Sequence, residues 1–200
     1  MVLPTQHLLL IPGRSLHSSP WKNGGGSTRE IMIYPEQSDV QHFDWRVSIA
    51  AVEQEGNFSQ FPDVDRHIML LSGTSMVLHS DTTQHTLLPY QPYSFPGEAS
   101  IYATLPHGST TDFNLMVRRD RAQGTLQAWT EPYSGLLEAG HTLLHCAVGA
   151  HEIILGHASH RLEAGDTLWI RQPHEHQQVL KVQPQSTGNC LVYTHIHSLT

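Results

Sequence analysis

The feature that most constrains the fold is a series of short segments in which every second residue is apolar. In residues 43–49, Phe43, Trp45, Val47 and Ile49 fall on one face of an extended chain, and the intervening polar side chains fall on the other. Gly, Pro, Asn and Asp separate the segments, and only residues 122–129 are expected to form a short helix. This pattern predicts an all-β sandwich or barrel. The other alternating segments are residues 30–34, 68–71, 75–79, 93–95, 101–103, 113–117, 143–148, 152–155, 167–170 and 190–195.

A weak internal repeat divides the chain into two related halves. The apolar pattern of residues 87–95 returns about 75 residues later in residues 162–170, and Gly73 has a counterpart in Gly149. The second copy, LEAGDTLWI, resembles the L-x-x-G-D-x-x-x-I signature of cupins, in which Gly-Asp makes a turn into a barrel strand. The repeat therefore favours two cupin halves in one chain.

The charge balance excludes several classes of partner. The chain carries 11 Lys and Arg against 18 Asp and Glu, a net charge of -7, and its two lysines are Lys22 and Lys181. Phosphate contacts need clustered cations, so neither nucleic acid nor an anionic membrane surface is expected as a partner. Cys146 and Cys190 match no metal or redox spacing. With no signal-peptide pattern and no apolar run of about 20 residues, a cytoplasmic location is expected.

An ordered series of motifs in the first 120 residues is more specific than the alternation. It closely resembles the HutD/Ves family over roughly residues 8–120, whereas the last third matches only as a degenerate cupin. One position departs from the family pattern, because Asp63 follows Phe61-Pro62 where the family usually has Gly. The motifs are residues 21–31 (WKNGGGSTREI), 43–50 (FDWRVSIA), 56–62 (GNFSQFP), 65–66 (DR), 70–73 (LLSG), 95–97 (FPG) and 112–116 (DFNLM).

This resemblance implies a fold and a class of function. Family members are bicupins, two-barrel proteins of the jelly-roll or double-stranded β-helix type. We therefore expect residues 1–120 to hold the first barrel with the motif block and residues 121–200 to hold the second, with a soft boundary because bicupins exchange strands. HutD is associated with histidine utilisation as a small-ligand-binding governor, with formylated glutamate as the suggested ligand. Ves proteins are known mainly as stress-induced.

The glycine run at residues 24–26 suggests an anion-binding loop. Lys22 and Asn23 precede it, and Thr28 and Arg29 follow, so backbone amides would be flanked by two cations and two hydrogen-bonding side chains. Arginine binds carboxylates bidentately, and concave rows of amides favour anions. The competing interpretation is a tight turn with surface charges. The loop is not a nucleotide-binding P-loop, because the GxxxxGK[ST] pattern is absent.

Further ligand-binding candidates lie on the strands and loops that follow. Arg46 and Ser48 share the polar face of an alternating segment, which points either into the barrel or into solvent. Asp65-Arg66 is interpreted as an internal ion pair. Lys22, Arg29 and Arg46 would neutralise a carboxylate, and Asn23, Thr28 and Ser48 would orient it. Trp21, Trp45 and Phe61 would form the pocket wall unless the tryptophans are plain core; Ser59 lies in a loop over the barrel mouth, and Asp112 and Asn114 share a strand face.

Sixteen histidines raise the question of a metal site. Alternate strand residues face the same way, so His-x-His can put two imidazoles on one ion. The chain has His174-x-His176 and His195-x-His197, but neither pair is followed by Glu at cupin spacing. A metal at His174 and His176 remains an alternative, and no cofactor is expected.

These observations predict a metal-independent bicupin that binds a small carboxylate, with no catalytic residue assigned. The alternative is a small-molecule cupin enzyme: an isomerase, a hydrolase or a metal-dependent oxygenase. A homodimer and a monomer are both open, and fold alone does not decide the function.

Overall fold

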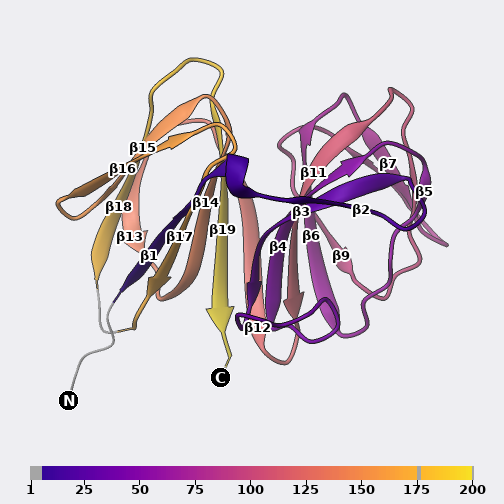
Figure 1. Cartoon of the computed structure of the whole chain (residues 1–200), viewed down its shortest axis with the longest axis horizontal. Coiled ribbons are helices and arrows are strands. Elements are labelled where there is room, and N and C mark those ends of the chain that lie inside the picture. The colour runs from indigo at the N-terminus through magenta and orange to yellow at the C-terminus, as the bar shows by residue number, and fades with distance from the viewer. Residues whose placement is uncertain (1–5, 175–176, 200) are drawn as a thin grey trace. The chain divides into compact units, whose positions relative to one another are not determined.

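The computed structural model describes residues 6–174 and 177–199, which form strands, turns and one 3-10 helix, η1 (Gly13–Ser15). The predicted all-β class is confirmed. The chain divides into two compact units (Figure 1). The N-terminal unit comprises Leu16–Gly124 with Leu199–Thr200, and the C-terminal unit comprises Met1–Ser15 with Thr125–Ser198. Within the described residues, no helix is long and apolar enough to cross a membrane.

The N-terminal unit contains a six-stranded and a four-stranded sheet, in which neighbouring strands are antiparallel. Such pairing lets each sheet turn one apolar face inward. The six-stranded sheet has the order β2 (Ser18–Pro20), β3 (Gly26–Tyr34), β4 (Trp45–Val52), β11 (Thr110–Arg118), β6 (Val64–Ser72) and β9 (Tyr93–Pro96). The four-stranded sheet has the order β5 (Gly56–Asn57), β10 (Tyr102–Thr104), β7 (Met76–His79) and β8 (Gln84–Leu87).

The core of the N-terminal unit lies between these two sheets. Ile68 and Leu70 of β6 are fully buried in one apolar cluster with Met76 of β7 and Leu87 of β8. Burying an aliphatic side chain of this size stabilises a fold by about 1.5–3 kcal/mol. The alternation read from the sequence therefore marks the side chains that hold the two sheets together.

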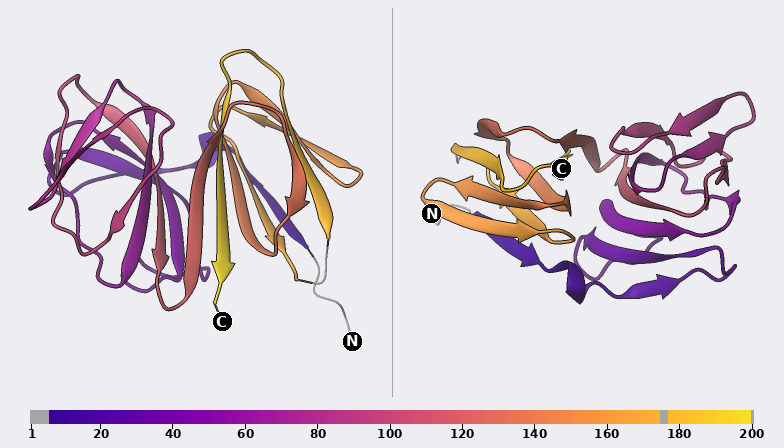
Figure 2. Two further views of the ribbon diagram at one scale, coloured as in Figure 1. Left: turned by 180° about the vertical axis from the view of Figure 1, so that it is seen from behind. Right: turned by 90° about the horizontal axis from the view of Figure 1, so that it is seen from above.

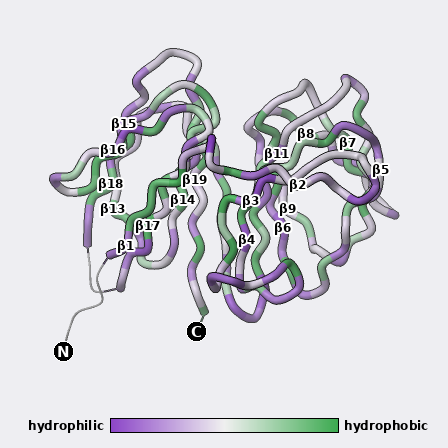
Figure 3. Tube along the Cα trace, viewed as in Figure 1, coloured by the Kyte–Doolittle hydropathy of each residue, from purple (hydrophilic) through white to green (hydrophobic). Residues whose placement is uncertain are grey.

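The C-terminal unit also contains two sheets. Its core contains Leu144 and Leu168 from the five-stranded sheet and Ile153, Leu162 and Leu180 from the four-stranded one. Figure 3 shows hydrophobic stretches along strands such as β14 and β17. The sheet orders are β1 (His7–Ile11), β17 (Thr167–Gln172), β14 (Gly140–Val148), β19 (Cys190–Ser198) and β12 (Ala122–Trp129), and then β13 (Tyr133–Leu137), β18 (Gln178–Pro184), β15 (Ala150–Leu155) and β16 (Ala158–Glu163).

The first strand belongs to the second unit. β1 pairs with β17, with His7 opposite Arg171 and Ile11 opposite Thr167, and Figure 2 shows the two strands side by side. The first barrel was expected to hold residues 1–120, whereas the described residues 6–15 lie in the C-terminal unit. β12 starts in one unit and ends in the other, close to the expected boundary at residue 120.

The helix expected over residues 122–129 is wrong, because these residues form β12. Gly124 and the β-branched Thr125 lie in the middle of the segment, and both residue types disfavour a helix interior. Ala122 and Leu126 are buried while Gln123 and Thr125 are exposed. This is the alternation of a strand with one inward face.

The weak repeat corresponds to equivalent turns and hairpins. Gly73 joins β6 to β7 and Gly149 joins β14 to β15, and both have positive φ, 93° and 78°. The cupin-like Gly-Asp lies between β16 and β17, where Gly165 has a φ of 95°. The carboxylate of Asp166 accepts the backbone N–H of Gly13 at 2.9 Å, which fixes the N-terminal segment to this turn.

Candidate functional site

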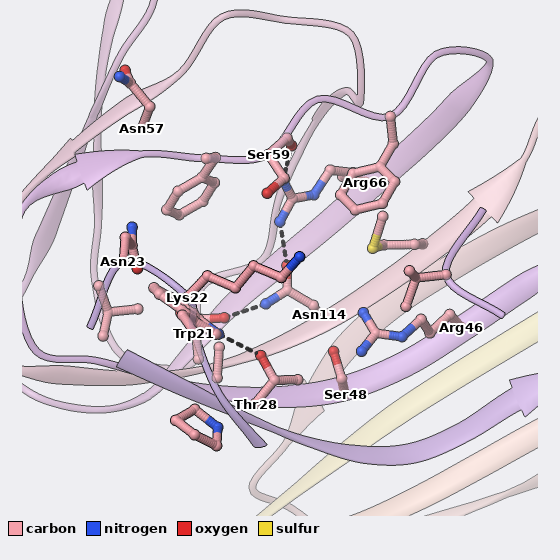
Figure 4. A pocket seen from close by; sticks show the side chains of 18 residues that line it. Trp21, Lys22, Asn23, Thr28, Arg46, Ser48, Asn57, Ser59, Arg66 and Asn114 are labelled. Carbon is pink, nitrogen blue, oxygen red and sulfur yellow. Dashed lines mark hydrogen bonds between the residues drawn. The ribbon is translucent and has the colours of Figure 1, made fainter. Parts of the chain in front are cut away.

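A cavity of about 600 Å³ opens inside the N-terminal unit, on the inner face of the six-stranded sheet (Figure 4). Strands β3, β4, β6 and β11 form its floor, and residues 20–23 and 57–61 form its rim. The structure brings together the predicted ligand-binding residues Trp21, Lys22, Asn23, Thr28, Arg46, Ser48, Ser59, Phe61, Asp112 and Asn114, all of which line this cavity.

Two predicted residues lie outside the cavity lining because of strand alternation. Arg46 and Ser48 face inward from β4, so Trp45 between them faces the other way. Trp45 is fully buried there and stacks on Tyr34, with ring centroids 5.4 Å apart. Arg29 follows the inward-facing Thr28 on β3 and is likewise absent from the lining. Neither residue is part of the candidate site.

The glycine run forms a tight turn between β2 and β3. The N–H of Gly24 donates to the carbonyl of Trp21 at 3.0 Å, and the N–H of Gly25 donates to Oδ1 of Asn23 at 3.1 Å. Gly24 has a φ of 70°, which favours glycine. These two amides are used within the turn and are not free to bind an anion, which agrees with the competing interpretation of a tight turn. The turn instead carries residues 21–23 to the cavity rim.

A hydrogen bond joins a side chain of the rim to one of the floor. Nε1–H of Trp21 donates to Oγ1 of Thr28 at 2.8 Å. Gly26 permits the close approach, because a Cβ there would lie 2.1 Å from the carbonyl oxygen of Ala51 and 3.0 Å from the Trp21 ring. The turn and the indole therefore form one packed wall of the cavity.

Arg66 is a functional candidate that the sequence pattern did not indicate. Its guanidinium is buried at the cavity floor, with the rings of Phe58, Phe61 and Phe95 at 5.1, 5.9 and 5.0 Å. Such contacts favour a cation over the faces of aromatic rings. Burial lowers the pKa of Arg66 to about 10, so it remains charged at neutral pH.

The expected ion pair between Asp65 and Arg66 does not form. Adjacent residues of β6 point to opposite faces, and Asp65 binds Nε of Arg119 at 2.6 Å on the outer side. Arg66 instead shares the inner face with Val64 and Ile68, which are both buried. The signal that could have identified Arg66 was an arginine at a position that strand alternation assigns to the apolar inner face.

Asn114 lies between Arg66 and Asp112 on the cavity floor. Nη2 of Arg66 donates to Oδ1 of Asn114 at 2.9 Å, and Nδ2 of Asn114 donates to Oδ1 of Asp112. Asp112 is 1% exposed, and its Oδ2 has no hydrogen-bond partner among the described residues. Burial raises the pKa of Asp112 to about 7, although the nearby Arg66 lowers it.

The remaining charged side chains in the lining, Lys22 and Arg46, are both positive. Nε of Arg46 donates to the carboxylate of Glu30 at 2.8 Å, and Figure 4 shows the ammonium of Lys22 pointing into the cavity. The lining therefore combines three cations and three aromatic side chains with one acid of raised pKa. This arrangement suits a small organic anion.

The C-terminal unit contains a buried Cys-His-Asn arrangement that does not support nucleophilic catalysis. Sγ of Cys146 lies 3.3 Å from Nδ1 of His151, and Nε2 of His151 lies 3.2 Å from Oδ1 of Asn189. Burial raises the pKa of the Cys146 thiol to about 12, and its side chain is 0% exposed. The reactive form of cysteine is the thiolate, so this thiol is structural.

The alternative metal site receives no support from the described part of the chain. His174 is exposed, and its ring lies edge-on to that of His197 at 6.0 Å. His176 lies outside the described residues. Over residues 6–174 and 177–199, no group of three or more His, Cys, Asp or Glu side chains is arranged to hold a metal ion.

The comparison with protein families identifies the chain. The sequence profile of the HutD family matches residues 14–191. The chain belongs to the HutD family. Protein Ves of Cronobacter sakazakii is 43% identical over 109 residues, which cover 54% of this chain and 59% of that protein. An uncharacterized 21.2 kDa protein in the hutC 3' region of Pseudomonas putida is 36% identical over 145 residues, covering 72% and 75% of the two chains.

Solved structures support the same assignment. HutD from Pseudomonas fluorescens SBW25 is 28% identical with a TM-score of 0.83, covering 97% of this chain and all of that one. Lactobacillus farciminis oxalate decarboxylase is 8% identical with a TM-score of 0.61, covering 94% and 85% of the two chains, and shows the fold alone. This HutD-family chain is a two-barrel cupin, as the sequence predicted. The matched region spans 59% of the Ves protein, less than two thirds of its length.

Proposed function

We propose that this HutD-family protein binds a small organic carboxylate in the cavity of the N-terminal unit, without a metal ion. The observation that carries the proposal is the buried charge of Arg66. Within the described residues, the guanidinium of Arg66 donates to neutral oxygens, the carbonyl of Ser59 and Oδ1 of Asn114, and its Nε has no hydrogen-bond partner. Buried charges in proteins are normally paired, because an unpaired one is costly. A carboxylate in the cavity would supply the missing anion.

The rest of the lining fits an anion with a small organic body. Lys22 and Arg46 add positive charge, while Trp21, Phe58 and Phe61 offer apolar surface. A cavity of about 600 Å³ lies within the range of about 300–1,000 Å³ that is usual for small-molecule sites. Its volume leaves room for more than a carboxylate group alone.

The family suggests which carboxylates to try first. The HutD structure from Pseudomonas fluorescens was obtained in a formate condition, and the Pseudomonas putida relative lies beside hutC. We therefore propose that the protein acts as a small-ligand-binding governor of histidine utilisation. Its ligand would be formylglutamate-like and its location cytoplasmic. The link of Ves proteins to stress is a second context for the same binding function.

The geometry favours binding over catalysis. Ser48 and Ser59 line the cavity without a neighbouring histidine in the lining, so neither is set up as a nucleophile. Asp112 is the lining group whose pKa suits proton transfer near neutral pH. A cupin enzyme would use it as an acid or base, and mass spectrometry of each ligand after incubation would detect that conversion.

A thermal-shift panel tests the proposal. Wild-type protein is heated with formate, acetate, N-formylglutamate, urocanate or glutamate. The ligand concentration is varied from 0.1 to 100 times a Kd that is assumed to be about 1 mM, which corresponds to a binding free energy of about 4 kcal/mol. A ligand that binds only the folded state at 100 Kd stabilises it by about 2.7 kcal/mol and raises Tm. At least one carboxylate should raise Tm in wild type and in Arg29→Gln, and should raise it by clearly less in Arg66→Gln. If no carboxylate shifts Tm of the wild type, the proposal fails.

A further inference from the structure

The Asp112 carboxyl group is an unusual component of an anion site. It lies on β11 between Ala50 of β4 and Leu70 of β6, lines the cavity and is almost fully buried. A carboxylate in this position would repel an incoming anion. The presence of an acid on the floor of a cationic cavity therefore requires a chemical explanation.

The charged groups around Asp112 come from each element packed against it. Arg66 projects from β6, Arg46 from β4 and Lys22 from the turn before β3, and all three line the same cavity. Glu30 of β3 is bound to Arg46 at 2.8 Å and is absent from the cavity lining. No histidine is among the residues that line the cavity. Asp112 is therefore the lining group whose protonation can change near neutral pH.

The hydrogen bonds fix where a proton on Asp112 would sit. Asn114 must turn its carbonyl oxygen toward the guanidinium of Arg66, so its Nδ2–H group faces Oδ1 of Asp112. Oδ1 is thereby occupied as an acceptor. The buried Oδ2, which has no partner among the described residues, is the oxygen left to carry a proton or to accept one from a ligand.

Resting on the proposed function, we propose that Asp112 binds the ligand as a neutral carboxylic acid, with its Oδ2–H donating to a carboxylate oxygen of the ligand. Binding then takes up one proton from solvent, which moves to Oδ2, and no other bond forms or breaks. Two carboxylates in contact in a buried site cannot both stay ionised, so they share a proton. Burial raises the pKa of Asp112 to about 7, and the charge of a bound carboxylate would raise it further.

This arrangement also selects among ligands. With Asp112 neutral, the cavity presents three cations and no free carboxylate to the bound molecule. A ligand with an ammonium group beside its carboxylate, such as glycine, would bury that ammonium without an anionic partner. Acetate and other carboxylates without a neighbouring ammonium should therefore bind more tightly than glycine, by about tenfold or more.

Isothermal titration calorimetry of acetate binding, in MOPS and in imidazole at pH 6, 7 and 8, measures the proton uptake. These buffers differ in ionisation enthalpy, so the difference in heat gives the protons bound per acetate. A carboxyl group with a pKa of about 7 is half protonated at pH 7, so uptake should be about 0.5 there and about 0.9 at pH 8. The affinity should fall by up to about tenfold per pH unit above pH 7.

Two variants complete the test. Asp112→Asn carries the neutral group permanently, so it should bind acetate with no proton uptake and with little dependence on pH. Asp65→Asn, on the outer face of β6, should behave as wild type. Acetate binding to wild type without proton uptake would overturn the role of Asp112 and leave carboxylate binding intact, as would glycine binding more tightly than acetate. A wild type that binds none of the tested carboxylates would overturn the proposed function itself.

Discussion

Arg66 and Asn114 are joined by a hydrogen bond of 2.9 Å across the inner face of the six-stranded sheet, from Nη2 to Oδ1. The same amide donates to Asp112, so one neutral side chain separates a buried cation from a buried acid. This separation leaves Arg66 available to an outside anion. A direct ion pair with Asp112 would have used that charge within the protein.

Replacing Asn114 should reveal the energetic value of this bridge. Asn114→Ala removes hydrogen bonds from both Arg66 and Asp112 and leaves their buried polar atoms unsatisfied, so the free energy of unfolding should fall by about 2–3 kcal/mol. Urea denaturation measures the change. Asn57→Ala, at the exposed rim of the same cavity, should cost less than about 0.5 kcal/mol. Equal losses in both variants would show that the bridge contributes nothing.

The glycine run offers a matched pair of variants. Gly26→Ala places a Cβ 2.1 Å from the carbonyl oxygen of Ala51, and the backbone of two strands must move to relieve the clash. We expect a loss of about 3 kcal/mol or more. In Gly25→Ala the new Cβ meets Asn23 no closer than 3.4 Å, so the change should stay within about 1 kcal/mol. The melting temperatures of the two variants measure the difference. A lower melting temperature for Gly25→Ala than for Gly26→Ala would contradict the prediction.

Asp63, which departs from the family pattern, has a φ of 62°. The left-handed region costs most residues about 1–2 kcal/mol and glycine almost nothing. Asp63→Gly should therefore stabilise the protein by up to about 1 kcal/mol, while Asp63→Ala should destabilise it by a similar amount. Denaturant unfolding of both variants measures their relative stability. If Asp63→Ala is more stable than Asp63→Gly, residue 63 does not have a left-handed backbone conformation.

Asp112 should also make the stability of the unliganded protein depend on pH. Its folded pKa of about 7 lies above its unfolded value of about 3.9, so the folded state holds the extra proton between these values. Stability from this group is complete below about pH 4 and is lost as pH rises through 7, with a slope of up to about 1.4 kcal/mol per unit.

The difference between wild type and Asp112→Asn isolates this contribution. Burial lowers the pKa of His141 to about 4, which gives a slope of the opposite sign, but His141 is present in both proteins and cancels. Urea unfolding at pH 5 and pH 8 should show wild type losing stability relative to Asp112→Asn. A constant difference across this range would contradict a raised pKa for Asp112.

Much of the fold could be predicted because alternation marks strands that have one buried face. Each alternating segment overlaps a strand, from β3 to β19, and the Gly-Asp turn lies where the cupin signature predicts it. The short, polar strands β2 and β5 left no such signal. The pairing of β1 with β17 could not be predicted either, because no local pattern encodes which distant strand an edge segment joins.

Most of the residues that line the candidate site were expected from the sequence, but the role of Arg66 was not. Alternation placed Arg46 and Ser48 on one face and Trp45 on the other, and the structure shows the polar pair lining the cavity. Arg66 was interpreted with its neighbour Asp65, because adjacent opposite charges suggest a pair. Within a strand that inference fails, since neighbours point apart. An anion-binding role for the backbone N–H groups of the glycine run was expected from composition. Composition cannot show which of these N–H groups the turn itself uses.

The measurement that tests the central claim most directly is calorimetric titration of wild type, Arg66→Gln and Arg29→Gln with acetate and N-formylglutamate at pH 6.5. We predict one carboxylate site per wild-type chain, affinity lower by about tenfold to a hundredfold in Arg66→Gln, and unchanged affinity in Arg29→Gln. Wild-type affinity in Arg66→Gln, or an equal loss in both variants, would contradict the claim that the buried guanidinium of Arg66 holds the ligand.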